Sequence, residues 1–242
     1  ASDGGGAAQA IGIPMYVDPS SSAATWAQVT AAAPTVALLV ANPASGPGGS
    51  AQAEYTQAIA TAHAAGQAII GYVHTSYGNR ALAQVEADAD AWYSFYPAID
   101  GIFVDEGSTD TSTIAPYYQP LHDHVKAEPA GSRTVALNPG TLVDESFLQA
   151  ADVIVTFEDT YANYTNGSYP PNPAWMATYP RWRFWHLVLS AATTSDMQNA
   201  VMIARQRNAG YVYVTDQGPA TAYQQLVTGA YWQAELAAAG AP

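Results

Sequence analysis

The segment from Ile99 to Gly107 constrains the fold more than any other part of this sequence. In it, an apolar run ends abruptly in the adjacent carboxylates of Asp105 and Glu106. A strand buried on both faces of a parallel sheet reads as such a continuous apolar run. Residues 151–159 repeat the pattern and reach Glu158 near their end. Because α/β barrels carry their chemistry at the carboxyl ends of the strands, the two segments predict a site with two facing acids.

Six further apolar runs complete a regular series. The eight predicted strands are Ile11–Asp18, Thr35–Pro43, Ala68–Tyr77, Ile99–Gly107, Arg133–Thr141, Val153–Asp159, Arg183–Ser190 and Tyr211–Asp216. Alanine-rich stretches with helical propensity, such as 51–65 and 80–92, separate most of them. Strands that alternate with helices imply parallel βαβ units. In a chain of 242 residues, eight units predict a single-domain (β/α)8 TIM barrel over 11–242, behind a flexible tail at 1–10. An open, doubly wound sheet is the alternative.

Composition excludes several classes of function. The formal net charge of −13 argues against nucleic acid as a partner, because phosphate binding needs a basic surface. It suits a neutral or cationic ligand. The absence of cysteine excludes disulfides and cysteine-ligated zinc. No apolar run approaches the length of about 18 residues that would indicate a membrane-spanning helix. We interpret the glycine-rich start, Ala1–Ala8, as a mature N-terminus after signal-peptide removal, which predicts a secreted, extracellular protein.

Polar side chains finish every predicted strand. Those at or near the strand ends are Tyr16, Asp18, Asn42, His74, Tyr77, Asp105, Glu106, Asn138, Glu158, Asp159, His186 and Asp216. Glycoside hydrolysis needs one protonated carboxyl and one ionised carboxylate, so we expect Glu158 to face Asp105 or Glu106. Regular alternation in the sixth strand would place Glu158 and Thr156 together on the face toward the barrel mouth. Parity does not choose between the two acids of the fourth strand, and a bulge there could present both.

Metal catalysis is a second class of chemistry. His74, His186, Asp105 and Asp216 could in principle ligate zinc. The motif from His122 to His124 also has the pattern of a metal-binding pair, but it lies in the stretch 117–127, which we expect to be helical. Residues two apart on a helix do not share a face. We therefore interpret this motif as a solvated helix face and predict no metal site and no cofactor.

Five segments in one order resemble the spherulin-4 family. They are Ile13–Pro19, Ala41–Gly48, Gly71–Gly78, Asp100–Glu106 and Leu137–Gly140, and the series covers about residues 11–217. The resemblance implies a secreted microbial (β/α)8 glycoside hydrolase of glycoside hydrolase family 135. Characterised fungal members cleave α-1,4-linked N-acetylgalactosamine in galactosaminogalactan, a partly deacetylated and therefore cationic exopolysaccharide. Since the family's name comes from a protein associated with slime-mould encystment, a wall-associated or carbohydrate-binding role without catalysis is an alternative.

The family's essential acids map onto Asp105, Glu106 and Glu158. By analogy with barrel α-galactosidases, we expect Asp105 to be the nucleophile and Glu158 the general acid/base. Glu106 could instead take the role of Asp105 or tune its pKa through like charge. We expect an endo-acting monomer with a polysaccharide substrate, and the sequence leaves the choice between retention and inversion open. The side chains expected to contact substrate are Tyr16, Asn42, His74, Asn138 and His186 by hydrogen bonding, Asp18 and Asp216 through an ammonium group, and Tyr77, Trp175 and Trp185 by stacking.

Overall fold

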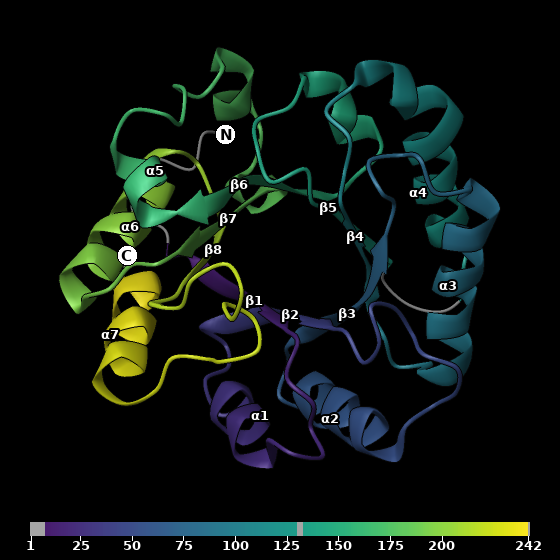
Figure 1. Cartoon of the computed structure of the whole chain (residues 1–242), viewed down its shortest axis with the longest axis horizontal. Coiled ribbons are helices and arrows are strands. Elements are labelled where there is room, and N and C mark those ends of the chain that lie inside the picture. Colours follow the sequence, from purple (N-terminus) through teal and green to yellow (C-terminus); the bar gives the residue numbers. More distant parts are fainter. Residues whose placement is uncertain (1–7, 130–132, 242) are drawn as a thin grey trace.

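Eight parallel strands close into a barrel in chain order, with helices around it (Figure 1). The computed structural model describes residues 8–129 and 133–241. The predicted (β/α)8 barrel is confirmed, and the open-sheet alternative is wrong. The strands are β1 (Ala10–Met15), β2 (Val36–Ala41), β3 (Ala68–His74), β4 (Gly101–Asp105), β5 (Thr134–Leu137), β6 (Val153–Thr160), β7 (Phe184–Leu189) and β8 (Tyr211–Val214).

The N-terminal boundary differs from the prediction. Residues 1–7 of the predicted tail lie outside the described residues. Gln9 is buried, and its backbone N–H donates a hydrogen bond to the carbonyl oxygen of Ala239 at 2.9 Å. Ala10 already pairs with Tyr211 of β8. Residues 9 and 10 therefore belong to the barrel rather than to a tail.

A large indole fills the inside of the barrel. Trp185 of β7 is fully buried, and its ring centroid lies 5.6 Å from that of Phe103. Gly12 of β1 faces the same indole, and a Cβ atom built on it would lie 2.9 Å from the Trp185 ring. Only glycine leaves room for the indole at this position, because any larger residue would have to push the ring aside.

Helices of eight or more residues cover the outside of the barrel except after β5 and β6, where the covering elements are shorter. The helices are α1 (Ala23–Thr30), α2 (Ala53–Ala64), α3 (Leu82–Phe95), α4 (Gln119–Lys126), α5 (Tyr161–Thr165), α6 (Thr194–Gln206) and α7 (Gly229–Gly240). After β5 there is only the 3₁₀ turn η3 (Glu145–Gln149), and after β6 the five-residue α5 with the 3₁₀ turns η4 (Ala174–Thr178) and η5 (Arg181–Arg183). Within the described ranges, none of the helices is long and apolar enough to cross a membrane.

Two seams of the barrel carry the shortest strand pairings. Strands β5 and β6 share two residue pairs, Ala136 with Val153 and Leu137 with Ile154. Strands β1 and β8 also share two. The sheet is continuous through both seams, but it has the fewest paired residues there.

Candidate active site

The three predicted acids lie together at the carboxyl ends of β4 and β6. Asp105 is the last residue of β4, Glu106 follows it, and Glu158 lies in the second half of β6. All three line a pocket of about 330 Å³. Its remaining lining residues are Tyr77, Asn138, Pro139 and Gly140.

The amide of Asn138 joins the two partly buried carboxyls. Its Nδ2 atom donates to Oδ1 of Asp105 at 2.8 Å and to Oε2 of Glu158 at 2.6 Å. The Oδ1 atom of Asn138 accepts from the backbone N–H of Gly140 at 3.0 Å, which directs the amide nitrogen toward the acids. Because one nitrogen reaches both carboxyls, the two accepting oxygens lie no further apart than the sum of the two bonds, 5.4 Å.

Two tyrosines hold the outer oxygens of the same carboxyls. The hydroxyl of Tyr72 on β3 donates to Oδ2 of Asp105 at 2.8 Å. The hydroxyl of Tyr223, in the segment between β8 and α7, donates to Oε1 of Glu158 at 2.6 Å. Tyr16 packs edge-on against both rings, with centroid distances of 5.5 and 5.3 Å. Asp105 and Glu158 thus each accept two side-chain hydrogen bonds, which fix the carboxyl planes.

Burial raises the pKa of both carboxyls. For Glu158, burial raises the pKa, the hydrogen bonds from Tyr223 and Asn138 lower it, and the charge of Asp105 raises it further. For Asp105, burial also raises the pKa, against the hydrogen bonds from Tyr72 and Asn138. A carboxyl whose pKa is raised by burial beside a second carboxyl is the arrangement by which enzymes hold one acid protonated and its neighbour ionised.

Glu106 enters the pocket through an unusual backbone conformation. Its φ of 52° is in the left-handed region, and the pairing of β4 with β3 and β5 runs without a register shift. The turn, and not the bulge considered from the sequence, therefore presents both acids. The Glu106 carboxylate accepts from the backbone N–H of Ser76 at 3.1 Å and lies 3.5 Å from Nδ1 of His74. Ser76 and Tyr77 are left-handed as well, with φ of 48° and 59°. Such clusters of strained backbone are typical of functional sites.

A bulge in β6 turns Glu158 toward the pocket. The register between β6 and β7 passes from Val155 opposite Trp185 to Phe157 opposite His186, so Thr156 is an extra residue. Val155 belongs to the same hydrophobic cluster as Trp185, which fills the barrel interior. Phe157 belongs to a second hydrophobic cluster, which includes Tyr164 of α5. The prediction that Thr156 and Glu158 share a face is therefore wrong. The bulge reverses the parity after Val155 and leaves Glu158 inside.

The other predicted ligands at the strand ends are placed as follows. Tyr77 is 64% exposed on the rim of the pocket. Asn42 accepts a hydrogen bond from the backbone N–H of Gly46 at 3.1 Å, and Asp18 accepts one from Ser20 at 2.7 Å. Asp216 is exposed and accepts from the Gln217 side chain at 2.9 Å. These three side chains have partners in their own loops, and their contact with substrate remains a prediction.

Three predicted contact residues lie where a sugar at the pocket would not reach them. Trp185 and His186 are 0% exposed, one inside the barrel and the other behind β7. Trp175 packs at a centroid distance of 5.9 Å against Phe184, the first residue of β7, and so lies toward the opposite end of the barrel. The predicted stacking on Trp185 and Trp175 and the predicted contact of His186 with substrate are wrong.

Two residues that bond to the acids, Tyr72 and Tyr223, were not predicted from the sequence. Tyr72 precedes His74 by two residues in β3, so alternation within that strand was a signal that both face the mouth. Tyr223 lies in an irregular segment, where no periodicity indicates which way a side chain points. Its role in the site follows only from its bond to Glu158.

The residues considered for a metal do not assemble into one site. His186 is buried behind β7, while Asp216 is exposed and bonded to Gln217. The predicted helix around His122 and His124 is confirmed, and the two imidazoles have different partners: His122 lies 3.1 Å from Asp123, and His124 lies 2.7 Å from Asp90 of α3.

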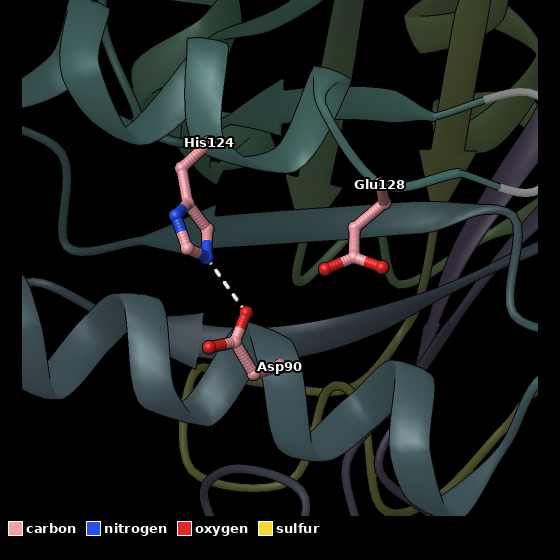
Figure 2. A group of neighbouring side chains, drawn as sticks. All are labelled: Asp90, His124 and Glu128. Carbon is pink, nitrogen blue, oxygen red and sulfur yellow. Dashed lines mark hydrogen bonds and ion pairs between the residues drawn. The ribbon is translucent and has the colours of Figure 1, made fainter.

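One group of side chains on the outer helices has the composition of a metal site. Figure 2 shows Asp90, His124 and Glu128, whose ligand atoms lie within 4.8 Å of one another. They lie on or next to α3 and α4, outside the barrel and away from the pocket. The dashed contact in Figure 2 joins Asp90 to His124 at 2.7 Å, which links the two helices and gives the imidazole a protein partner.

Paired acids at the mouth of a closed (β/α)8 barrel are compatible with a carbohydrate-active protein, and comparisons with known proteins support that class. The pattern of Spherulation-specific family 4 (Spherulin4) matches residues 10–239. The chain is 35% identical over 215 residues to Spherulin-4 of Physarum polycephalum. It therefore belongs to the spherulin-4 family. The match covers 84% of this chain and 62% of the Physarum protein, so the chain spans less than two thirds of that relative.

Solved structures extend the comparison. The crystal structure of Aspergillus clavatus Sph3 in complex with GalNAc superposes with a TM-score of 0.80 at 26% identity, covering 98% of this chain and 99% of Sph3. Dispersin B, at 8% identity and a TM-score of 0.56, covers 96% of this chain and 98% of its own. A GH18 chitinase from Pseudoalteromonas aurantia, at 15% identity and a TM-score of 0.54, covers 85% and 93%. At these identities the last two share the fold alone.

Proposed function

We propose that this protein is a glycoside hydrolase that cleaves an exopolysaccharide containing α-1,4-linked N-acetylgalactosamine, with Glu158 as general acid/base and Asp105 as nucleophile. The single observation that carries the proposal is the amide of Asn138, which holds both carboxyls at 2.8 and 2.6 Å. Two acids in one pocket, at a fixed separation and with raised pKa values, are the minimal equipment for glycoside hydrolysis.

The separation of the acids supports retention of configuration. Retaining enzymes hold their carboxyls about 5–5.5 Å apart, while inverting enzymes need about 6.5–9.5 Å to admit a water molecule. The oxygens held by Asn138 lie within 5.4 Å of each other. This upper limit is compatible with the spacing of retaining enzymes, so we infer that one carboxylate attacks the anomeric carbon directly.

The two roles follow from which acid holds the proton. Aspartic acid ordinarily ionises at a lower pH than glutamic acid. Repulsion between the two carboxylates favours a single proton shared by the pair. We assign that proton to Glu158, which then donates it to the leaving oxygen. The Asp105 carboxylate attacks the anomeric carbon, and Glu158 next removes a proton from the water that hydrolyses the covalent intermediate. Asn138 and the two tyrosines keep both groups oriented throughout.

We infer the substrate from the similarity to Sph3 and from the negative charge of the pocket and of the whole chain. Sph3, which covers almost the whole chain, is described in complex with GalNAc. The pocket adds the half-exposed carboxylate of Glu106, and the chain carries a net charge of −13, so a partly deacetylated and cationic polymer is a suitable ligand. Tyr77 on the open rim offers a ring for a second sugar. A monomeric state and an extracellular location are part of the proposal, the latter because the proposed substrate is an exopolysaccharide.

Hydrolysis of galactosaminogalactan, followed by mass spectrometry of the products, tests the proposal. We expect oligosaccharide products from the native protein and at least a 10³-fold loss of rate for Glu158→Gln, because the amide cannot donate a proton to the leaving oxygen. Glu145→Gln is the matched control, since Glu145 is exposed on η3, outside the pocket, and its side chain accepts a hydrogen bond from Tyr179. Proton NMR of the first product should show the α-anomer.

Three results would contradict parts of the proposal. Near-native turnover by folded Glu158→Gln would remove Glu158 from the mechanism. An active Asp105→Asn together with an inactive Glu106→Gln would exchange the roles of those two acids. Tight binding of the oligosaccharide without any new reducing ends would indicate a carbohydrate-binding protein rather than a hydrolase.

A further inference from the structure

A buried polar cluster lies behind the catalytic strand. On the outer side of β6 and β7, the aromatic rings of Phe157, Tyr164 and Tyr169 pack around the imidazole of His186. His186 and Thr156 are each 0% exposed. Buried polar groups cost folding free energy unless they are hydrogen-bonded, so such a cluster calls for an explanation.

Every polar atom of the His186 ring has a partner. Its Nε2 lies 3.1 Å from Oγ1 of Thr156 and 3.4 Å from the hydroxyl of Tyr169. Its Nδ1 lies 2.6 Å from the hydroxyl of Tyr164. Burial, with the nearby charge of Arg207, lowers the pKa of His186 to about 3. The ring is therefore neutral at any working pH, with one nitrogen that donates and one that accepts.

The residue that this cluster holds is the extra residue of the β6 bulge. Thr156 has no partner residue in the register with β7. A bulge can move along its strand unless side chains fix it, and a slip by one residue turns every following side chain to the other face. Glu158 is two residues further on, so a slip would point its carboxyl away from Asn138 and Tyr223. The Thr156 hydroxyl is bonded at the bulge itself, to the His186 ring and also to the Tyr169 hydroxyl of the same cluster.

We propose that Thr156 and His186 are positioning residues, whose buried bond fixes the bulge of β6 and thereby holds the Glu158 carboxyl in the active-site pocket. Tyr164 extends this support from α5 through Nδ1 of His186. The consequence for catalysis rests on the proposed role of Glu158, whereas the structural claim can be tested without any substrate.

The test compares Thr156→Val, which removes the hydroxyl at nearly constant shape, with Thr156→Ser, which keeps it. Displacement of a catalytic group by about 1 Å can cost about 100-fold in rate. We expect Thr156→Val to lower kcat by about 10- to 100-fold with little change in KM, and Thr156→Ser to stay within about threefold of the native value. Thr215→Val is the matched control, since Thr215 is equally buried at the end of β8 and its hydroxyl accepts a bond from Gln217.

A second readout follows the Glu158 carboxyl directly. In protein labelled with ¹³C at the glutamate carboxyls, the Glu158 resonance is the one missing from Glu158→Gln. The groups that face this carboxyl in the native protein are Asp105, Asn138 and Tyr223, and its pKa is raised by burial. We expect Thr156→Val to move the pKa down toward the ordinary value as the carboxyl leaves the pocket, and Thr215→Val to leave it in place.

The outcomes separate the two proposals. A native pKa for Glu158 together with native kcat in folded Thr156→Val would overturn the positioning role. A lowered pKa in a protein that hydrolyses no polymer would keep that role and refute the proposed function. If Thr156→Val does not fold, Tyr164→Phe decides, because it removes only the hydroxyl on Nδ1 of His186. It should then show the same two changes at smaller amplitude, and native values of both would overturn the proposal.

Discussion

Glu235 is a buried carboxyl that should make the stability of this protein depend on pH. It lies on α7 with 0% exposure. Its Oε1 atom accepts a hydrogen bond from the backbone N–H of Val214 at 2.8 Å, and its Oε2 atom has no partner among the described residues. Burial raises the pKa of Glu235 to about 8. The carboxyl is therefore protonated in the folded protein at neutral pH and ionised in the unfolded chain.

The magnitude follows from the difference in proton affinity between the two states. The pKa of Glu235 is higher in the folded protein than in the unfolded chain, so the folded state holds this proton more tightly. The stability that this difference contributes is fully present below the unfolded-state pKa of 4.5 and is lost as the pH rises through about 8. Each pKa unit of difference is worth about 1.4 kcal/mol, so the loss between pH 5 and pH 8 is on the order of 3 to 4 kcal/mol. Glutamine cannot ionise, and Glu235→Gln removes this loss.

Urea unfolding followed by tryptophan fluorescence, at pH 5 and at pH 8, measures the effect. We expect the free energy of unfolding of Glu235→Gln minus that of the native protein to be about 3 kcal/mol larger at pH 8 than at pH 5, so the variant gains stability relative to the native protein as the pH rises. Taking the difference between the two pH values cancels any constant cost of the buried amide. Glu54→Gln, exposed on α2, should change both values equally. An equal effect of Glu235→Gln at both pH values would refute the reasoning.

Two predictions concern the pocket. Tyr223→Phe removes a hydrogen bond that lowers the pKa of Glu158, so the alkaline limb of the pH–rate profile should move to higher pH, with kcat about tenfold lower. An unmoved limb in a pH titration of kcat would show that Glu158 is not the group that sets it. Tyr77→Ala removes the ring on the pocket rim, and we expect KM for the polymer to rise about tenfold at nearly constant kcat. A fall in kcat alone would indicate that Tyr77 acts on the acids rather than on a bound sugar.

The sequence predicted the barrel and the position of its acids because both depend on short-range patterns. A parallel strand buried on both faces is recognisable as an apolar run, and the residues that end such runs share one rim. The predicted ranges extended past the ends of the strands, as at Asp18, three residues beyond the end of β1. There the polar residues stand in loops and bond to their own neighbours.

The predictions were wrong where they depended on which side of a strand a side chain faces. Regular alternation failed at Thr156, because a single extra residue reverses the parity and leaves no mark in the composition of β6. Aromatic type did not separate Trp185, which fills the barrel, from Tyr77, which stands on its rim. Tyr223 bonds to Glu158 from 65 residues away along the chain, a contact that depends on how an irregular segment crosses the mouth.

The seam between β5 and β6 runs between the two hydrogen-bonded acids of the pocket. Asp105 ends β4, on one side of this seam, and Glu158 lies on β6, on the other side. The side-chain amide of Asn138, the residue after β5, bonds to both acids and so links the two sides of the seam. A ligand that contacts both acids, and so needs the two sides of this seam together, would bind the folded barrel alone and would raise its free energy of unfolding by mass action.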